Sequence, residues 1–259
     1  SNWDVSNVRL MSKMFYEADD FNQPIDDWDT GDVIIMREMF GKSSHVPADM
    51  VFNQNIGNWD VSRVIDMENM FSGTKDFNQD IGDWNVSNVT IMSEMFEGAS
   101  SFNQDIGDWN VSTVTEMYGM FVNATSFNQD LGGWDVSNVD NMGLLFNSSG
   151  LNTCNYDNTL IGWSALDLTP DVTLGASDIN YCNSETERQS IIDNFGWTID
   201  DDELDCSDPC LTSSISELNT ITDLRVFPNP TNKLFHVEMT LSESIDLQMQ
   251  VMDIHGRVV

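Results

Sequence analysis

Hydrophobic and polar positions repeat with one dominant period along the first 150 residues. The tryptophans of this region follow one another at spacings of 25, 31, 25, 25 and 25 residues, at Trp3, Trp28, Trp59, Trp84, Trp109 and Trp134. The longer gap also widens the usual spacing between two phenylalanines, so that extra residues lie within 41–51. A fixed period of this kind is typical of stacked repeats. The pattern predicts about six coils in residues 1–152.

Within one coil the apolar spacing predicts two short elements. Val89, Met92, Met95 and Phe96 form the stripe of a short helix facing a core, with Ser87 as its candidate N-cap. The rest of the coil places turn-forming residues between apolar ones, which predicts a turn and a short strand. Because one such unit cannot bury its own apolar face, neighbouring units must stack. The sequence predicts an α/β repeat solenoid.

Met and Trp recur in every coil, and core packing is the favoured interpretation of both. Met-rich surfaces can bind targets, but the helical spacing of the Met pairs indicates a buried face. Trp is expected at the core or its rim rather than as a platform for sugars. The stacked Asn side chains of a recurring Phe-Asn-Gln triplet are expected to bond the backbone of adjacent coils. The triplet begins at Phe21, Phe52, Phe77, Phe102 and Phe127.

Stacking also arranges acidic residues in columns. Asp80, Asp105 and Asp130 occupy one recurring position, and Asp83 and Asp108 occupy another. Like charges placed this close repel each other, so the columns need a physical reason. Calcium is a possible cofactor, because it takes several oxygen ligands from Asp, Asn and carbonyl groups. The alternative is that each Asp caps a turn on a solvated acidic face, and no stretch matches a calcium-loop motif.

The repeat pattern ends after Phe146, and residues 153–210 are predicted to cap the last coil. Residues 184–195 have the pattern of an amphipathic helix, with Ser184 and Glu187 as a capping box. Residues 211–222 are rich in Ser, Thr, Asn and Ile and are predicted to be a linker.

The 4 cysteines all lie in or after this cap. Their spacing is a poor match to a zinc site, and disulfides are favoured in an exported protein. The cysteines allow three pairings. We prefer Cys154 with Cys182 and Cys206 with Cys210.

Residues 223–259 alternate apolar and polar positions as β-strands do. Phe-Pro-Asn-Pro-Thr with a later Asp-x-x-Gly-Arg resembles the C-terminal sorting domain of type IX secretion cargo, although Lys233 replaces the usual Gly. The resemblance implies an incomplete β-sandwich signal, recognised by the outer-membrane export machinery of a Gram-negative bacterium. It implies a secreted or cell-surface protein. The residues that carry it are Phe227, Pro228, Asn229, Pro230, Asp253, Gly256 and Arg257.

The repeat carries a second resemblance. The unit W-[DN]-V-S-x-V-x-x-M-x-x-M-F, followed by F-N-Q-[DN]-[IL]-G, is similar to a bacterial surface-protein repeat related to the BspA-like leucine-rich repeats. This resemblance implies a leucine-rich-repeat-like solenoid on bacterial cells, often an adhesin and without enzymatic activity. The second coil departs from the pattern at Thr30-Gly31 and through its insertion.

The charge of the chain narrows the classes of partner. The sequence has 10 Lys+Arg against 43 Asp+Glu, a net charge of -33. This disfavours nucleic acids and anionic membrane surfaces as partners. No apolar run is long enough to span a membrane. The first residues carry no export signal, so we expect this sequence to be a piece of a longer chain.

The residue types predict a protein that is not an enzyme. No Ser or Cys lies in a nucleophile motif, and the acidic pairs are copied in every coil, whereas an active site would be unique. The leading hypothesis is a binding or adhesion module for a surface, glycan or protein ligand. The alternative is a structural surface protein or passive cargo, possibly calcium-stabilised. The insertion, with His45 and Pro47, is the first place to look for a local ligand site.

Overall fold

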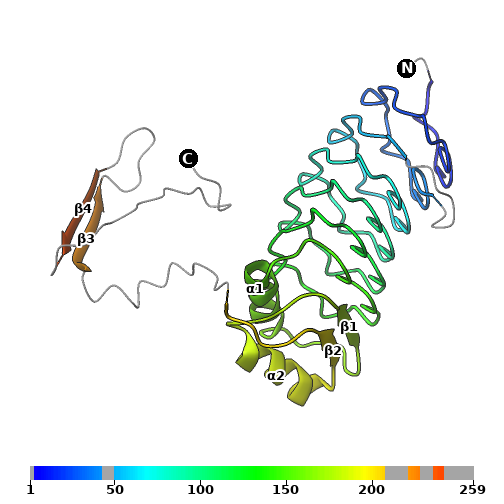
Figure 1. Cartoon of the computed structure of the whole chain (residues 1–259). Helices are drawn as coiled ribbons and strands as arrows, with labels where there is room; N and C mark the ends of the chain where they lie inside the picture. The colour runs from blue at the N-terminus through cyan, green and yellow to red at the C-terminus, as the bar shows by residue number, and fades with distance from the viewer. Residues whose placement is uncertain (1–2, 43–49, 208–220, 228–235, 242–259) are drawn as a thin grey trace. The chain divides into compact units, whose positions relative to one another are not determined.

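The structure is a computed structural model that describes residues 3–42, 50–207, 221–227 and 236–241. The chain divides into two compact units, Ser1–Cys210 and Leu211–Val259. The first unit stacks the coils in sequence order and ends in a cap that begins with helix α1 (Thr153–Trp163) (Figure 1). The second unit contains a pair of strands.

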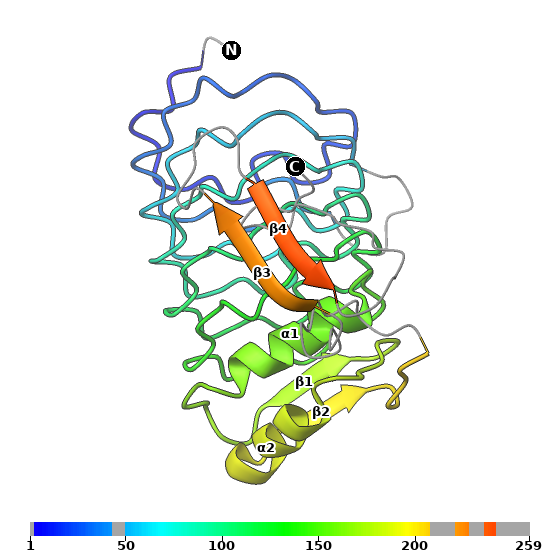
Figure 2. The same cartoon turned by 90° about the vertical axis from the view of Figure 1, so that its left-hand side faces the viewer.

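Aromatic columns run along the stack and form its core. The rings of Phe71, Phe96 and Phe121 stack at centroid distances of 5.7 Å in both steps. Trp109 stacks between the neighbouring tryptophans at 6.5 Å on each side. Of the twelve Met residues in the coils, all are buried except the half-buried Met14. The predicted stacking and the predicted core roles of Trp and Met are confirmed, and Figure 2 shows the successive coils.

The predicted helix in each coil is wrong. Residues 93–98 form consecutive turns, and every second N–H group of this stretch donates to the next coil. Met92 N donates to Glu116 O at 2.9 Å, where an α-helix would need a partner in its own coil. Met95 N donates to Met92 O, a bond three residues apart that matches the spacing of the Met pair. The apolar stripe therefore predicted burial correctly but not the helix.

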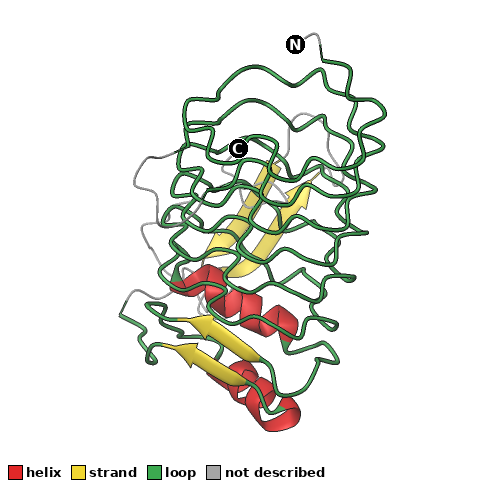
Figure 3. Ribbon diagram, turned by 90° about the vertical axis from the view of Figure 1, so that its right-hand side faces the viewer, coloured by secondary structure: helices red, strands yellow, loops and turns green. Residues whose placement is uncertain are grey.

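The predicted strand is reduced to single bridges at another place in the coil. One residue per coil forms a parallel bridge with a neighbouring coil, at Leu10, Ile35, Asp66, Ile91, Glu116 and Asn141. Ser87 is no N-cap either, because its N–H and hydroxyl groups donate to Asn85 Oδ1. Helices and strands of the first unit occur in its cap, as Figure 3 shows.

The cap continues the stack with regular elements. Strand β1 (Thr173–Ala176) pairs in parallel with β2 (Thr198–Asp201), and helix α2 (Glu185–Phe195) lies between them in sequence. Phe146 N of the last coil donates to Gly175 O of β1 at 2.9 Å. Helix α1 approaches the last coil so closely that a Cβ on Gly162 would lie 2.1 Å from Gly132 O. Only glycine fits at such a close backbone approach.

The helix predicted at residues 184–195 is present as α2, but its capping box is absent. Ser184 makes no side-chain capping bond to the helix. Its hydroxyl donates instead to Asp157 of α1 at 2.6 Å. The Ser184 N–H also donates to Asp157, so the backbone donor that Glu187 would accept from in a capping box is already used.

The preferred disulfide pairing is wrong. Cys182 bonds Cys206, with a Cα–Cα distance of 5.1 Å. The reason is a parallel bridge between Tyr181 and Leu204, which brings the two segments together. Cys154 is also disulfide-bonded, and Cys210 lies outside the described residues.

In the second unit, β3 (Ile221–Phe227) pairs antiparallel with β4 (His236–Leu241). The strand character predicted for this region is present. The described residues of this unit show a two-stranded sheet and not a sandwich.

Candidate functional site

The tryptophan column is not available as a binding platform. The five tryptophans from Trp28 to Trp134 are between 1% and 6% exposed. The indole N–H of Trp109 donates to Ile81 O of the preceding coil at 3.1 Å, and Trp134 repeats this bond to Ile106 O. Trp3, at the end of the stack, is 60% exposed.

The same indole bond continues into the cap, where the sequence period had ended. Trp163 Nε1 donates to Leu131 O at 3.0 Å, and Trp197 Nε1 donates to Thr169 O at 2.7 Å. Sequence reasoning missed both residues because their spacing differs from that of the coils. The presence of Trp itself after the last regular coil is the signal that could have indicated them.

The Phe-Asn-Gln triplets form the predicted ladder between coils. Asn53 Oδ1 accepts from Asn78 N at 3.0 Å and from Gln79 Nε2 at 2.8 Å. The next coil repeats both bonds, with Asn78 Oδ1 accepting from Asn103 N and Gln104 Nε2. These amides join the coils, so we assign them a structural role.

The predicted acidic columns hold turns together. Asp80, Asp105 and Asp130 each accept from the N–H group of the glycine two residues later. Asp83 and Asp108 are exposed. Asp60 follows Trp59, and hydrogen bonds from Ser62 lower the pKa of its carboxyl. In the part of the chain that the structure describes, no three His, Cys, Asp or Glu side chains gather as a candidate cation site. The geometry favours turn capping over calcium.

The insertion is described only at its edges. Lys42 Nζ lies 3.3 Å from Asp19 Oδ1, and the Lys42 side chain is 4% exposed. Val51 N donates to Asp19 O at 3.2 Å. His45 and Pro47 lie outside the described residues, so the hypothesis of a local ligand site there stays a prediction.

One face of the coils collects exposed apolar side chains. We define the ladder face as the segments that surround the first Met of each coil, where the backbone bridges between coils lie. It is distinct from the ladder of Phe-Asn-Gln amides. Its residues are 9–13, 34–38, 65–69, 90–94, 115–119 and 140–144. Among the residues whose burial the structure describes, seven large apolar side chains are exposed, and four of them lie on this face, namely Leu10, Ile65, Tyr118 and Leu144. Their exposed fractions are 62%, 44%, 36% and 38%. The bridges join these segments in one stack, so the four side chains lie on adjacent or next-but-one coils.

The ladder face also carries cations at its N-terminal end. Arg9 and Lys13 lie on the first coil and Arg37 on the second. Lys13 pairs with Glu38 at 3.1 Å, and Arg37 pairs with Glu68. Burial raises the pKa of the Glu68 carboxyl, while the charge of Arg37 acts in the opposite direction. This face therefore has mixed charge, in contrast to the acidic turns.

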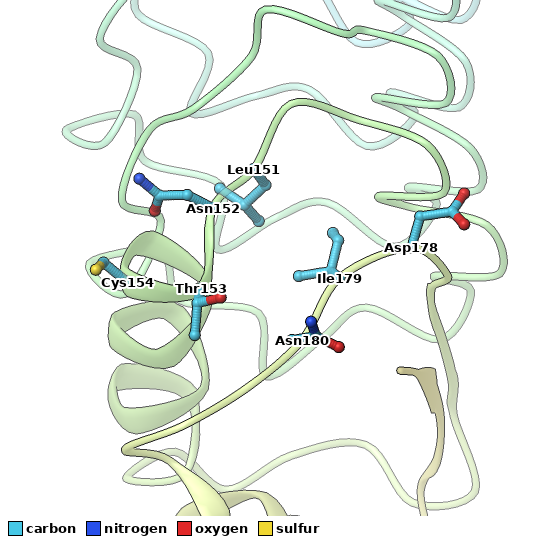
Figure 4. Close-up of a pocket in the computed structure, with 7 residues that line it drawn as sticks. All are labelled: Leu151, Asn152, Thr153, Cys154, Asp178, Ile179 and Asn180. Atoms are coloured by element: carbon cyan, nitrogen blue, oxygen red, sulfur yellow. The ribbon is translucent and has the colours of Figure 1, made fainter. Parts of the chain in front are cut away.

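A small cavity lies between the last coil and the cap. It has a volume of about 210 Å³ and is lined by residues 151–154 and 178–180. Figure 4 shows Asn152, Thr153 and Asn180 around it. Asn152 caps α1 by accepting from Asn155 N at 2.9 Å. The polar groups at the cavity thus stabilise the start of the helix.

Asp157 and Asp201 hold the cap together. Asp157 accepts from the N–H groups of Cys182, Asn183 and Ser184. Arg188 donates to both carboxylate oxygens of Asp201, and Tyr156 Oη donates to Asp201 Oδ2 at 2.9 Å. Burial, together with the Asp201 carboxylate, raises the pKa of Tyr156 well above its ordinary value. Asp201 is paired with Arg188, and Asp157 is satisfied by backbone N–H groups, as buried charges must be.

Comparison with known families follows the same division of the chain. Residues 1–51 and 43–159 match the family described as Mycoplasma protein of unknown function, DUF285. The chain belongs to this family. Residues 225–259 match the secretion system C-terminal sorting domain. No curated protein and no solved structure matches the chain.

The sorting domain indicates the localisation of this DUF285 protein. It indicates export across the outer membrane, to the cell surface or the medium, through the secretion machinery that reads the domain. The predicted signal residue Phe227 ends β3. The other predicted signal residues, Pro228, Asn229, Pro230, Asp253, Gly256 and Arg257, lie outside the described residues. Among the described helices, none has the length and apolar character needed to span a membrane.

Proposed function

We propose that this exported repeat protein is a binding or adhesion module and that its ladder face contacts the ligand. The observation that carries the proposal is the concentration of exposed apolar side chains on that face. Single exposed apolar residues are normal on any protein surface. A gathering of them on one segment is typical of an interaction site.

Variation between coils supports the same assignment. The position that forms the bridges is occupied by Leu10, Ile35, Asp66, Ile91 and then Glu116. The residue that follows it is Met in every coil. A uniform core below a variable face is the arrangement that solenoids use for extended binding surfaces. Surface, glycan and protein ligands remain open under this proposal.

The alternative function is that of a structural surface protein or passive cargo. The tryptophans are buried, which argues against a sugar-stacking platform and favours this alternative. The acidic turns favour a solvated, non-adhesive surface. Stabilisation by calcium belongs to this alternative. We further propose that the protein has no enzymatic activity, because its carboxylate pairs recur as turn caps in successive coils.

The test compares apolar substitutions on and off the ladder face. Ile65→Ser and Tyr118→Ser are combined on the ladder face, and Ile161→Ser on α1 is the matched control, since Ile161 is 41% exposed. Each purified protein is applied to a glycan array and to immobilised extracellular-matrix proteins. We expect the double variant to bind roughly tenfold or more weakly than the wild type, because it lacks a pair of apolar interface anchors. The control should bind as the wild type does.

Thermal melts of the three proteins show whether each is folded. Equal binding by the wild type and both variants, or no wild-type binding to either panel, contradicts the proposal and favours the passive alternative.

A further inference from the structure

A tyrosine, a cation and a carboxylate form a recurring cluster in this chain. In the first coil, Lys13 Nζ lies 4.8 Å from the centre of the Tyr16 ring and 3.1 Å from Glu38 Oε2. The electrons of the ring attract the cation, and the carboxylate forms an ion pair with it. One ammonium group therefore interacts favourably with two neighbours at once.

The cap repeats this cluster around Arg188. The Arg188 Cζ atom lies 4.8 Å from the centre of the Tyr181 ring, and Arg188 Nε donates to Asp201 Oδ2 at 2.8 Å. The hydroxyl of Tyr156 donates to the same Asp201 oxygen at 2.9 Å. Three of the 4 tyrosines thus lie in a cluster that contains a Lys or Arg and a carboxylate.

Tyr118, on the ladder face, is the tyrosine without such a cation. It lies within residues 76–187, a stretch of the sequence that contains no Lys, Arg or His. Among the described residues, the cations found over tyrosine rings are Lys13 and Arg188, and neither lies over Tyr118. The Tyr118 side chain is 36% exposed, so a cation from outside the chain can reach it.

The next coil holds the Tyr118 ring in place. A Cβ on Gly143 would lie 3.1 Å from Tyr118 Cδ2 and 3.2 Å from Tyr118 Cε2, so the ring lies directly against the backbone at Gly143. The glycine leaves the room that the ring occupies. A ring that is already ordered loses little conformational freedom when a ligand binds.

Two carboxylates lie in the segments next to this ring. Glu116 is two residues before Tyr118, with the buried Met117 between them. In the preceding coil, Glu94 N donates to Tyr118 O at 2.8 Å, and Glu94 Cγ would lie 3.3 Å from a Cβ on Gly119. Neither carboxylate forms an ion pair within the part of the chain that the structure describes.

We propose that Tyr118, together with Glu94 and Glu116, binds an arginine or lysine side chain of a basic protein partner. This inference rests on the proposed function, because it names the chemistry that one part of the ladder face recognises. The cation of the partner completes at Tyr118 the cluster that Lys13 completes at Tyr16. The net charge of -33 also attracts basic partners toward the protein.

A second copy of the chain is a poor occupant of this site. Its 43 acidic residues against 10 basic ones make the approach of two copies repulsive. An anionic or neutral ligand would leave the carboxylates beside the ring without a partner. Charge complementarity therefore selects a cationic partner.

The experiment uses a short arginine-rich peptide with blocked ends and a matched neutral peptide that carries citrulline at every arginine. Binding of both peptides to the full chain is measured by titration calorimetry at about 0.15 M salt, which screens long-range attraction. We expect Tyr118→Leu, which keeps the net charge and an apolar side chain, to bind the arginine peptide roughly threefold more weakly or worse. Glu94→Gln should weaken binding by a similar factor of roughly two to five.

Asp83→Asn is the matched control for charge, because it removes an exposed carboxylate that lies outside the ladder face. It should bind the arginine peptide as the wild type does. Equal binding by Tyr118→Leu and the wild type overturns the proposal, as does equal binding of the two peptides. A wild-type dimer in sedimentation that Tyr118→Leu abolishes also overturns it, because the site would then belong to a second copy.

The glycan and matrix-protein panels separate this inference from the proposed function. Suppose that Ile65→Ser with Tyr118→Ser loses panel binding, while Glu94→Gln keeps it and the arginine peptide is not preferred. The ladder face then remains the binding surface, and the cation site is overturned. Binding of the arginine peptide through Tyr118 without wild-type binding to either panel supports the cation site and contradicts adhesion to those panels.

Discussion

The residue two positions after the first Met of each coil, which precedes the second Met or, in the last coil, Leu145, adopts a left-handed backbone. Its φ lies between 53° and 59° in all six coils, at Lys13, Glu38, Asn69, Glu94, Gly119 and Leu144. Most L-residues avoid this region because Cβ approaches the neighbouring carbonyl. The conformation is kept because it directs the N–H group to the next coil, as from Glu94 to Tyr118 O at 2.8 Å. Interaction between coils thus outweighs local preference.

A second left-handed position lies two residues after the first Phe of a coil, as at Gly98 after Phe96. It allows the energetic cost of a left-handed backbone to be measured. Gly98 has a φ of 65°, and a Cβ there would meet Gly73 atoms only at 3.8 Å or more. Gly98→Ala should therefore lower the free energy of unfolding by about 1 kcal/mol, through backbone strain alone. Asn123→Gly, at the same position of the next coil with φ 57°, should change it little. Denaturant melts measure both, and an unchanged G98A would contradict the strain.

Burial opposes the charge of Glu97. Burial raises its pKa, while a hydrogen bond from Ser72 Oγ lowers it. A carboxyl with a raised folded-state pKa is destabilising when ionised at neutral pH. The cost disappears as the pH falls through the folded pKa toward the ordinary value of 4.5.

We expect Glu97→Gln to raise the melting temperature at pH 7 and to lose this advantage at acid pH. Gln still accepts the Ser72 bond, so the change isolates the charge. Asp83→Asn removes the same charge from an exposed carboxylate and should give a smaller rise. An equal rise in the two variants would mean that general charge relief, not burial of Glu97, is responsible.

At the scale of the element, a coil is held by its neighbours rather than by itself. Its N–H groups, its Asn and Gln amides and its indole N–H all bond an adjacent coil. The regular elements appear where this arrangement ends, in the cap. There, α1 and α2 satisfy their own backbone, and Asp157 joins α1 to the start of α2.

The amide ladder should be a major part of the junction between coils. Asn53→Ala removes the acceptor of Asn78 N and Gln79 Nε2. We expect a loss of about 1–3 kcal/mol in the free energy of unfolding, because Asn78 N loses its acceptor and Gln79 Nε2 keeps only its bond to Asn53 O. Asn88→Ala removes a single exposed bond to Ser62 O and should cost less. Denaturant melts that rank the two variants in the opposite order would contradict the structural role of the ladder.

At the scale of the whole molecule, the charge of -33 must be spread over a long stack. Carboxylates placed in register repel one another, and salt screens this repulsion. Bonds from turn N–H groups stabilise part of the charge, as at Asp105. The protein should therefore become more stable with rising ionic strength.

The effect of calcium on the melting temperature is a second prediction for the whole molecule. With turn-bound aspartates and no candidate cation site among the described residues, excess calcium should raise the melting temperature no more than magnesium at equal ionic strength. The comparison is a thermal melt of each sample against chelator. A calcium-specific rise of many degrees would restore the aspartate columns as ion sites, since a ligand of the folded state stabilises it by mass action.

The sequence by itself determined the stack, its core and its export. A period of 25 residues places each Trp, Met and Phe on its own equivalent in the next coil, so burial follows from spacing alone. The Asn ladder followed in the same way, because a stacked amide has its copy within reach. The sorting domain was readable because its motif is local in sequence.

Only the tertiary structure decided how each coil satisfies its backbone. A spacing of three between Met92 and Met95 is shared by a helix and by consecutive turns, and the acceptor in the next coil selects the turns. The pairing of Cys182 with Cys206 depended on the bridge beside it. The tertiary structure also decided that Leu10 and Ile65 lie on an exposed face. These features depend on contacts between residues far apart in sequence, which periodicity does not specify.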